Sequence, residues 1–294
     1  MWRAQAEITM TLTLTHTSEI EAPAWAEPML RLDGLTKQYM TKSGMLTALE
    51  PASFSMEKSE LVSIVGPSGC GKSTLLHIVG GLIEPTAGSM YLEGQEFWGP
   101  GAERGMVFQA YTLFPWLSVR ENVKFGPRMR GFNLEECENL ASHFLDAVNL
   151  HGFHHHYPKQ LSGGMRQRVA IARALANKPR ILLMDEPFGA LDAQTRVVMQ
   201  DLVLDIRKRE RTTTLFITHD IDEAVYLSDR ILVMTARPGR FKAEIPVPFG
   251  PDRDNDLRDT PEFFEIRKHV HHLLHEEGRA VVEAELAGAQ IREK

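Results

Sequence analysis

The amino-acid sequence predicts an α/β fold built on a mostly parallel β-sheet. Short apolar runs rich in β-branched residues recur along the chain, and stretches with helical spacing of apolar residues separate them. Strands that alternate with helices in this way are typical of parallel sheets. The composition agrees, since 43% apolar and 24% charged residues over 294 positions are ordinary for a globular protein and exclude a disordered or collagen-like chain.

Strands are expected at several places along the chain. The first regular pattern is at residues 29–32. The clearest is 61–65, which is short and almost wholly apolar, as a strand buried on both faces must be. The remaining expected strands are 105–108, 181–184, 214–218 and 231–234.

Helical patterns lie between these strands. Residues 73–79 follow the clearest strand directly, and residues 195–211 carry Val198, Leu202 and Ile206 at four-residue spacing. These two segments are therefore expected to form helices that cover the sheet.

Two further segments are expected to be helical. Residues from about 117 to 175 contain no strong strand pattern and are expected to form a mainly helical insert. Near the end, Thr260 and Pro261 begin a short helix that Gly278 is expected to end. Apolar residues mark one face of that helix, namely Phe263, Ile266, Val270 and Leu274.

Charge and cysteine content exclude several classes of protein. Lys and Arg number 33 against 39 Asp and Glu, a formal net charge of −6, which argues against a surface made to grip nucleic acid. No apolar run reaches the roughly eighteen residues of a membrane-spanning helix. Two cysteines, Cys70 and Cys137, are too few for a disulfide framework and fit a reducing cytoplasm.

Two segments could suggest a secretory signal or a metal site, but their sequences do not fit these functions. Residues 1–28 lack the apolar core of a secretory signal and are expected to be a disordered leader. Histidines 154–156, with His151 nearby, lack the paired Cys or carboxylate spacing of a metal site, so a solvated loop is expected there.

A glycine-rich segment between a strand and a helix predicts a phosphate-binding loop. Its residues are Gly66, Pro67, Ser68, Gly69, Cys70, Gly71, Lys72, Ser73 and Thr74. Glycines let backbone N–H groups curl around phosphate oxygens, and the N-terminus of the following helix adds partial positive charge. In this pattern Lys72 reaches the β- and γ-phosphates and the Ser73 hydroxyl binds Mg²⁺. The flanking strand and helix argue against the alternative, a glycine turn without a ligand; Cys70 is expected to fill space.

Two adjacent carboxylates follow the apolar strand 181–184. Asp185 and Glu186 are thereby expected at the carboxyl edge of the sheet, where ligands bind in open α/β folds. Beside a phosphate-binding loop, Asp185 is expected to hold Mg²⁺, directly or through water, and Glu186 to polarise the attacking water. The alternative is that the two acids only cap the loop that follows them.

Together with this loop, the segment LSGGM at residues 161–165 resembles the nucleotide-binding subunits of ATP-binding-cassette (ABC) transporters. The resemblance covers roughly residues 29–240. It implies ATP and Mg²⁺ as ligands. It also implies a P-loop NTPase core with a mostly parallel sheet, an antiparallel β-subdomain and a helical insert at about residues 112–175.

The resemblance implies that two copies of the ATPase share each ATP site. In that family, Ser162 and the amides of Gly163 and Gly164 bind the γ-phosphate of ATP held by the P-loop of the other copy. Met165 stands where many relatives have Gln, at a position that mostly packs, so this departure does not put activity in doubt.

Four more residues match family motifs by their position. The resemblance implies that Gln109 touches Mg²⁺ or water, that His219 contacts the γ-phosphate and orients the catalytic glutamate, and that Asp192 communicates across the dimer. It implies that Tyr39 stacks on adenine, the alternative being a tyrosine at a strand end that merely packs.

A narrower resemblance concerns the ATPases of nitrate, sulfonate and taurine importers. It rests on the segments PWLSV at 115–119, DEPFGALD at 185–192 and MTARPGR at 234–240. It implies a peripheral ATPase subunit on the cytoplasmic face of the inner membrane, with permease transmembrane subunits, a substrate-binding protein and a second ATPase subunit, identical or related. The ATPase domain is expected at 29–249 and a C-terminal helical extension at 250–294.

Two other functions remain open on the sequence. An ABC ATPase acting on DNA or ribosomes would carry coiled coils, zinc-binding Cys pairs or a second cassette, yet only about ninety residues separate Lys72 from Ser162. An exporter often carries its own membrane spans, which this sequence lacks. No nucleic-acid partner is therefore expected.

Large apolar residues cluster directly after Gln109. Phe114, Trp116 and Leu117 form a stripe of a kind that is usually buried in a core, but Pro115 prevents a helix here. By resemblance, this side of the helical insert receives a short cytoplasmic helix of the permease. At least one of Phe114 and Trp116 is therefore expected to be partly exposed.

Overall fold

The computed structural model describes residues 27–42 and 44–292, with side chains as far as residue 279. The predicted leader, residues 1–28, lies outside the described residues except for its last two. The strands are β1 (Leu30–Thr41), β2 (Gly44–Met56), β3 (Leu61–Val65), β4 (Ala87–Leu92), β5 (Gln95–Glu96), β6 (Arg104–Val107), β7 (Ile181–Asp185), β8 (Thr213–Ile217), β9 (Arg230–Met234) and β10 (Phe241–Pro246). The α-helices are α1 (Lys72–Val79), α2 (Val119–Met129), α3 (Leu134–Ala147), α4 (Gly163–Leu175), α5 (Ala193–Glu210), α6 (Ile221–Leu227) and α7 (Pro261–Arg292), and the 3-10 helices are η1 (Pro158–Gln160) and η2 (Asn255–Asp259).

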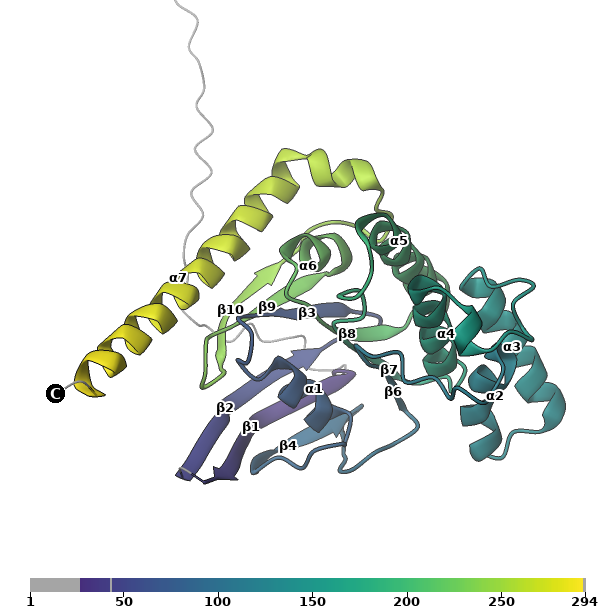
Figure 1. Ribbon diagram of the computed structural model, residues 1–294, viewed down its shortest axis with the longest axis horizontal. Helices are drawn as coiled ribbons and strands as arrows, with labels where there is room; N and C mark the ends of the chain where they lie inside the picture. Colours follow the sequence, from purple (N-terminus) through teal and green to yellow (C-terminus); the bar gives the residue numbers. More distant parts are fainter. Residues whose placement is uncertain (1–26, 43, 293–294) are drawn as a thin grey trace, which may run out of the picture.

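The larger of two sheets runs through the centre of the molecule (Figure 1). Its strand order is β10-β9-β3-β8-β7-β6, and neighbouring strands are parallel except for β10 with β9. The predicted mostly parallel sheet is thereby confirmed. The strands expected at 61–65, 105–108, 181–184, 214–218 and 231–234 all belong to it, each within one residue of its predicted limits.

Both faces of this sheet are buried, which is why its strands carry apolar residues at successive positions. Along β7, Ile181 and Leu183 pack into a core shared with α1 and the smaller sheet, whereas Leu182 and Met184 pack into a core shared with α4 and α5. Successive side chains of a strand point to opposite faces, so one short strand serves both cores. Because β7 is packed on both faces, its carboxyl end is held in place, and so is the polar residue Glu186 that follows it.

The smaller sheet is antiparallel, with the order β2-β1-β4-β5. The strand expected at 29–32 is part of it, but the prediction was too short, because β1 continues to Thr41. The register shifts between Leu32 and Leu35, and Gly34 adopts a φ of +60° there. The Asp33-Gly34 pair is thus a bulge inside a long strand rather than its end.

The predicted helical insert is confirmed, since α2, α3, η1 and α4 fill residues 119–175 and no strand occurs there among the described residues. Polar side chains cap its helices. The Ser118 side chain accepts a hydrogen bond from the Glu121 amide, and Asn133 and Glu136 form a reciprocal capping box at the start of α3.

The histidine-rich loop supports the first turn of α2. The amides of Val119 and Arg120 donate to the carbonyl oxygens of His156 and His154, at 2.8 and 3.0 Å. Orphan N–H groups of a helix start need such acceptors, so the loop has a structural part in the insert. His155 is exposed, as expected of a solvated loop, whereas His154 and His156 are half-buried.

Helix α5 is confirmed, although its expected apolar face was wrong at one position. Val198 is 50% exposed, whereas Leu202 and Ile206 are buried. The buried face also contains Met199 and Val203. An α-helix has 3.6 residues per turn, so a strict spacing of four drifts off the buried face within two turns.

Helix α7 is much longer than expected, because it continues through Gly278 to Arg292. Gly278 contacts nothing at the position of an added Cβ and does not adopt a positive φ. A glycine costs only about 1 kcal/mol in a helix interior, which strong helix formers on either side of it offset. The start of α7 is anchored by Phe263, which is buried and stacks with Phe249 at 6.3 Å between ring centroids.

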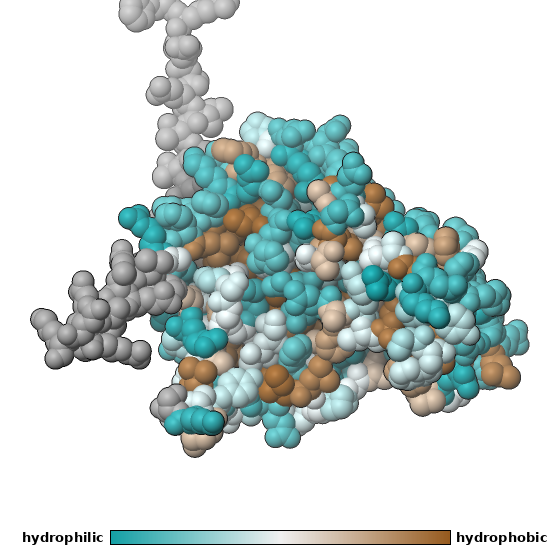
Figure 2. All heavy atoms as spheres, viewed as in Figure 1, coloured by the Kyte–Doolittle hydropathy of each residue, from teal (hydrophilic) through white to brown (hydrophobic). Residues whose placement is uncertain are grey.

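Figure 2 shows a largely hydrophilic face, on which hydrophobic residues form small separate groups. Among the helices of the described residues, none combines the length and hydropathy needed to span a bilayer.

Candidate functional site

The parallel strands β9, β3, β8, β7 and β6 end along one edge of the larger sheet, and polar residues follow most of them. The glycine-rich loop follows β3, and Glu186 follows β7. Thr218 and His219 follow β8, and Gln109 comes shortly after β6. Residues from distant parts of the chain thus meet at the edge where ligands bind in open α/β folds.

Glycines shape the loop between β3 and α1. Gly69 and Gly71 adopt φ angles of +73° and +107°, which favour glycine over other residues. A Cβ on Gly71 would lie 2.8 Å from the Ala48 carbonyl oxygen, so the site requires glycine for a second reason. Gly71 also precedes the first turn of α1, whose free N–H groups would face an anion bound at this position.

Lys72 is folded back over this loop. Its side chain is buried, and Nζ donates hydrogen bonds to the carbonyl oxygens of Gly66 and Pro67 at 2.8 and 3.0 Å. These uncharged acceptors hold the ammonium group near the loop and leave its charge uncompensated by a carboxylate. Such a group favours a phosphate ligand.

Cys70 has a packing role in the loop. It is buried, and burial raises the pKa of its thiol above the ordinary value, although Lys72 nearby acts in the opposite direction. A Cβ on Gly66 would lie 2.8 Å from the Cys70 sulfur, so the two residues are in tight contact. A protonated thiol in such contact fills space, as the sequence predicted.

Ser73 and Asp185 bring a hydroxyl and a carboxylate oxygen together. The Ser73 hydroxyl donates to Asp185 Oδ1 at 2.9 Å, and His77 Nε2 lies 3.4 Å from Asp185 Oδ2. Mg²⁺ prefers hydroxyl, carboxylate and carbonyl oxygens. The donor atoms at this position therefore fit a magnesium ion.

Glu186 has an unusual backbone conformation, with a φ of +43°. Its amide donates to the Ile217 carbonyl at 2.9 Å, and its Oε2 lies 3.0 Å from His219 Nδ1. Gln109 comes close as well: its Nε2 and Glu186 Oε2 lie 3.8 and 3.9 Å from the point where a Cβ on Gly189 would stand. Strained residues of this kind concentrate at functional sites.

A cavity of about 270 Å³ opens over the loop. Tyr39 and Glu186 line it together with the loop residues Ser68, Gly69, Gly71, Lys72, Ser73 and Thr74, and Leu46, Ala48 and Arg237 complete it. The Tyr39 ring is half-buried and faces Lys37 Nζ at 5.0 Å. An aromatic face and a phosphate cradle thus border one cavity, as a nucleotide requires.

Arg237 is a cavity residue that the sequence interpretation missed. Its Nε and Nη2 donate to the Gly69 carbonyl at 3.1 and 3.0 Å, which joins two residues 168 positions apart. Its position in the sequence could have indicated it, because Arg237 comes shortly after β9 and β9 pairs with β3. A basic residue at the carboxyl end of the neighbouring strand is well placed to hold a carbonyl group of this loop.

Ser162, Gly163, Gly164 and Asp192 do not line this cavity. They form a group of their own. Ser162 caps α4, Asp192 caps α5 by accepting from the Thr195 amide at 2.9 Å, and Thr195 Cγ2 would lie 2.5 Å from a Cβ on Gly164.

The start of α4 carries free amides towards solvent near Ser162, which is exposed. Hydrogen bonds from the Thr195 amide and hydroxyl lower the pKa of the Asp192 carboxyl below its ordinary value. Asp192 therefore stays ionised at neutral pH on this exposed surface.

A hydrogen bond between Thr218 and Glu223 fixes the backbone next to His219. Thr218 Oγ1 donates to Glu223 Oε2 at 2.6 Å, and Glu223 is buried. Desolvation by burial raises the pKa of Glu223, and the negative charge of Asp220 raises it further. The hydrogen bond from Thr218 and the positive charge of Arg196 lower the pKa. A buried carboxyl thereby fixes the backbone from which His219 projects.

Phe114 and Trp116 lie on the surface of the helical insert. Trp116 is 71% exposed and Phe114 half-buried, so the prediction that at least one is partly exposed is confirmed. Phe114 packs on Phe125 at 4.4 Å between ring centroids and on Trp116 at 5.7 Å. Arg173 of α4 binds the preceding segment through the Thr112 carbonyl at 2.7 Å.

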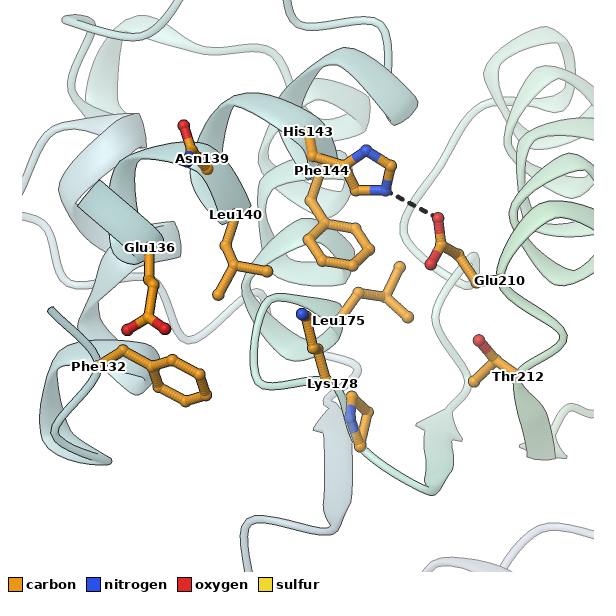
Figure 3. A pocket seen from close by; sticks show the side chains of 11 residues that line it. Phe132, Glu136, Asn139, Leu140, His143, Phe144, Leu175, Lys178, Glu210 and Thr212 are labelled. Carbon is orange, nitrogen blue, oxygen red and sulfur yellow. Dashed lines mark hydrogen bonds and ion pairs between the residues drawn. The ribbon is translucent and has the colours of Figure 1, made fainter. Parts of the chain in front are cut away.

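A larger cavity, of about 600 Å³, lies away from these residues (Figure 3). Phe132, Leu140, Phe144 and Leu175 form its apolar wall, and His143 Nε2 of α3 spans it to Glu210 Oε1 of α5 at 2.8 Å. The polar side chains that line this cavity do not point together at one position where a ligand could bind. The loop after β3 therefore remains the candidate site.

Comparison with known proteins identifies the family. Residues 49–189 match the family model described as ABC transporter. The nitrate import ATP-binding protein NrtD of Synechocystis sp. is 45% identical over 262 residues, covering 87% of this chain and 98% of the relative. The chain belongs to the ABC transporter ATP-binding family. The taurine import ATP-binding protein TauB of Jannaschia sp. is 48% identical to this ABC protein over 235 residues, which are 79% of the chain and 88% of the relative.

A solved structure agrees with this assignment. An ATP-binding cassette determined as a dimer in a post-hydrolysis state, with ADP and Pi bound, is 35% identical to this ABC protein. It superposes with a TM-score of 0.67, covering 76% of this chain and all (100%) of the cassette. The predicted family, P-loop NTPase fold and ATPase activity are confirmed: this ABC protein binds and hydrolyses ATP.

Proposed function

We propose that this ABC ATPase powers the import of a small anion, such as nitrate, a sulfonate or taurine, through separate membrane subunits. The observation that carries the proposal is the 45% and 48% identity to nitrate and taurine import ATP-binding proteins over most of the chain. We assign residues 29–249 to the ATPase domain, about 112–175 to its helical insert and 250–294 to a C-terminal helical extension.

In this proposal the cavity over the P-loop holds ATP. The loop from Gly66 to Thr74 cradles the phosphates with its amides, and Lys72 places its charge against the β- and γ-phosphates. Tyr39 stacks on the adenine, which its position at the rim of the same cavity supports.

Ser73, Asp185 and Gln109 would hold Mg²⁺, since their oxygen atoms suit this ion and Ser73 and Asp185 are already hydrogen-bonded at 2.9 Å. When bound, the ion neutralises charge on the phosphate oxygens. Until then the Ser73 hydroxyl donates to Asp185, which holds the Ser73 oxygen next to the carboxylate.

Glu186 is the proposed catalytic carboxylate, which accepts a hydrogen bond from the attacking water and polarises it. An ionised carboxylate is only an acceptor, so at the 3.0 Å contact His219 Nδ1 donates to Glu186 Oε2. His219 thereby orients Glu186 towards the water, while its own ring edge faces the γ-phosphate. Gln109, whose Nε2 lies near Glu186, would report the state of the γ-phosphate to the helical insert.

We propose that two ATPase subunits, identical or related, complete each site. Ser162, Gly163 and Gly164 sit at the exposed, capped start of α4, where free amides bind an anion, but they are absent from the cavity of their own P-loop. They would therefore act on ATP held by the other subunit. Asp192, hydrogen-bonded to Thr195 beside Gly164, would transmit the presence of that subunit.

The proposed partners are permease transmembrane subunits and a substrate-binding protein, with no nucleic-acid partner. The ATPase would lie peripherally on the cytoplasmic face of the inner membrane. The exposed Trp116 and half-buried Phe114 suit a groove for a short permease helix, since aromatic residues supply most hot spots of interfaces.

Reconstitution tests this function. The ATPase, copurified with its permease and placed in proteoliposomes, is assayed with the substrate-binding protein and nitrate, taurine or an alkanesulfonate in turn. We expect one of these anions to raise ATP turnover and to accumulate inside. Failure to copurify with any membrane protein, with DNA or ribosomes stimulating turnover instead, would contradict the proposal, as would flux in the export direction.

A further inference from the structure

The middle of α7 reaches the loop that joins β9 to β10. Glu277 Oε2 accepts a hydrogen bond from the Ala236 amide at 3.1 Å. Lys242 Nζ of β10 donates to Glu277 Oε1 at 2.7 Å and to Glu276 Oε2 at 2.8 Å. The Glu277 side chain is 15% exposed and that of Glu276 is 49% exposed, so only the first is enclosed at this contact.

The loop held by Glu277, residues 235–240, is tightly built. Thr235 Oγ1 donates within the loop to carbonyl oxygens of Ala236 and Pro238, at 3.0 and 3.1 Å, and the Arg240 amide donates back to Thr235 Oγ1 at 3.2 Å. Local hydrogen bonds of this kind restrict the backbone to one conformation. A change in the position of the Ala236 backbone would therefore also move the other residues of this loop.

The same loop is wedged against the P-loop. A Cβ on Gly239 would lie 1.9 Å from the Cys70 carbonyl oxygen, so the two backbones are in direct contact. The Gly239 amide donates to the Ala48 carbonyl at 3.2 Å, and Gly239 accepts from the Glu50 amide at 2.9 Å. The loop thus lies between the P-loop and β2.

Arg237 completes the connection to the nucleotide cavity. Its guanidinium donates twice to the Gly69 carbonyl, at 3.1 and 3.0 Å, and both residues line the cavity. The side chain is exposed, so its conformation depends on this fork and on the backbone that carries it. A planar, always charged guanidinium holds a carbonyl more rigidly than an ammonium group does.

We propose that α7 sets the nucleotide affinity of the P-loop through Glu277 and Arg237, which act as positioning residues. Glu277 fixes the amide before Arg237, Arg237 fixes Gly69, and the P-loop is held ready for phosphate before the nucleotide arrives. Preorganisation of this kind raises affinity because less ordering remains to be done on binding. The inference concerns any nucleotide at this P-loop and goes beyond the proposed import of an anion.

Equilibrium binding of a fluorescent ATP analogue to the full chain tests the proposal. We expect Arg237→Ala to raise the Kd about tenfold and Glu277→Ala about three- to fivefold, the loss typical of one or two hydrogen bonds. Turnover of Glu277→Ala at saturating ATP should stay within about twofold, because Glu277 lies outside the cavity and touches no reacting atom. The matched control is Glu276→Ala, which removes one Lys242 contact and should change the Kd by less than about 1.5-fold.

A double-mutant cycle decides whether the two residues act in one chain. The Glu277→Ala and Arg237→Ala double variant should bind ATP no more weakly than Arg237→Ala alone. Glu277→Gln, whose amide oxygen can still accept from Ala236, should restore most of the affinity. Additive effects, an unchanged Kd for Glu277→Ala, or an equal loss in Glu276→Ala would overturn the proposal. If Glu277→Ala fails to fold, Glu277→Asp, whose shorter side chain falls short of the Ala236 amide, provides the same cycle with Arg237→Lys, and normal affinity in both would also overturn the proposal.

Discussion

His219 Nδ1 and Glu186 Oε2 lie 3.0 Å apart, at the ends of the adjacent strands β8 and β7. The backbone reinforces this contact, because the Glu186 amide donates to Ile217, the last residue of β8. The two side chains are thus brought together by sheet pairing as well as by their own hydrogen bond.

Glu186→Gln should keep ATP affinity while losing most turnover. Removing a group that polarises water typically slows the reaction ~10² to 10⁴-fold. Because ATP then persists, the variant should accumulate as an ATP-bound dimer, visible by size-exclusion chromatography with Mg²⁺ and ATP. Turnover near the wild-type rate would show that another residue activates the water.

His219→Ala should abolish or severely slow hydrolysis with little effect on the fold. Its side chain is 61% exposed, and exposed positions usually change stability by less than about 0.5 kcal/mol. Steady-state turnover, Mg²⁺-ATP affinity and the melting temperature are measured together. The matched control is His155→Ala, another exposed histidine, which should leave all three unchanged. Near-normal turnover in His219→Ala would remove His219 from the mechanism.

Lys72→Ala should weaken nucleotide binding itself, in contrast to Glu186→Gln. A hydrogen-bonded charge on phosphate is worth about 1.5–3 kcal/mol, or roughly a 10- to 100-fold change in Kd. The comparison is made by titrating a fluorescent ATP analogue into each variant, with Lys58→Ala, an exposed lysine, as control. Equal loss of affinity in the Lys72 and Glu186 variants would contradict the division of roles between them.

Trp116→Ala should weaken permease association or transport more than it lowers ATP binding. The side chain is 71% exposed, so its removal should cost the isolated subunit less than about 0.5 kcal/mol. Copurification of the permease and the melting temperature of the subunit are the two measurements. Met129→Ala, at a residue of the same insert that is 69% exposed, is the control. A variant that loses stability but keeps permease association and transport would contradict the proposed docking role of Trp116.

Glu223→Gln should change stability in a pH-dependent way. Desolvation raises the folded-state pKa of Glu223 above the ordinary value of 4.5. A carboxyl with a raised pKa contributes its stability below the unfolded value, and that contribution is lost as pH rises through the folded value. The variant should therefore gain free energy of unfolding over the wild type at neutral pH.

Urea denaturation at a series of pH values measures this effect. The advantage of Glu223→Gln should shrink as pH falls and vanish below the ordinary value of 4.5. Gln keeps an oxygen for the Thr218 hydroxyl, and Arg196 keeps its contact with Asp220 at 3.1 Å. A variant whose disadvantage grows with pH would mean that the ionised carboxylate stabilises the fold.

The sequence by itself determined the fold class, the five parallel strands of the larger sheet and most residues of the nucleotide cavity, but not the antiparallel edge strand β10. The strand at 61–65, the loop from Gly66 to Thr74 and the Asp185-Glu186 pair are contiguous patterns. Each is set by local chemistry: apolar runs for a strand buried on both faces, glycines for positive φ, and acids placed at a strand end. Such patterns can be recognised from neighbouring residues alone, because they do not depend on contacts with distant parts of the chain.

Only the tertiary structure decided the features that depend on distant partners. Arg237 joins Gly69 across 168 positions, and no local pattern around either residue indicates the other. The Asp33-Gly34 pair resembles a turn until β2 and β4 pair on both sides of β1 and absorb it as a bulge. Gly278 stays helical because contacts such as that of Glu277 with Ala236 hold α7 in place. In each case packing free energy from residues far along the chain exceeds the preference of a few local dihedral angles, which is typically about 1 kcal/mol.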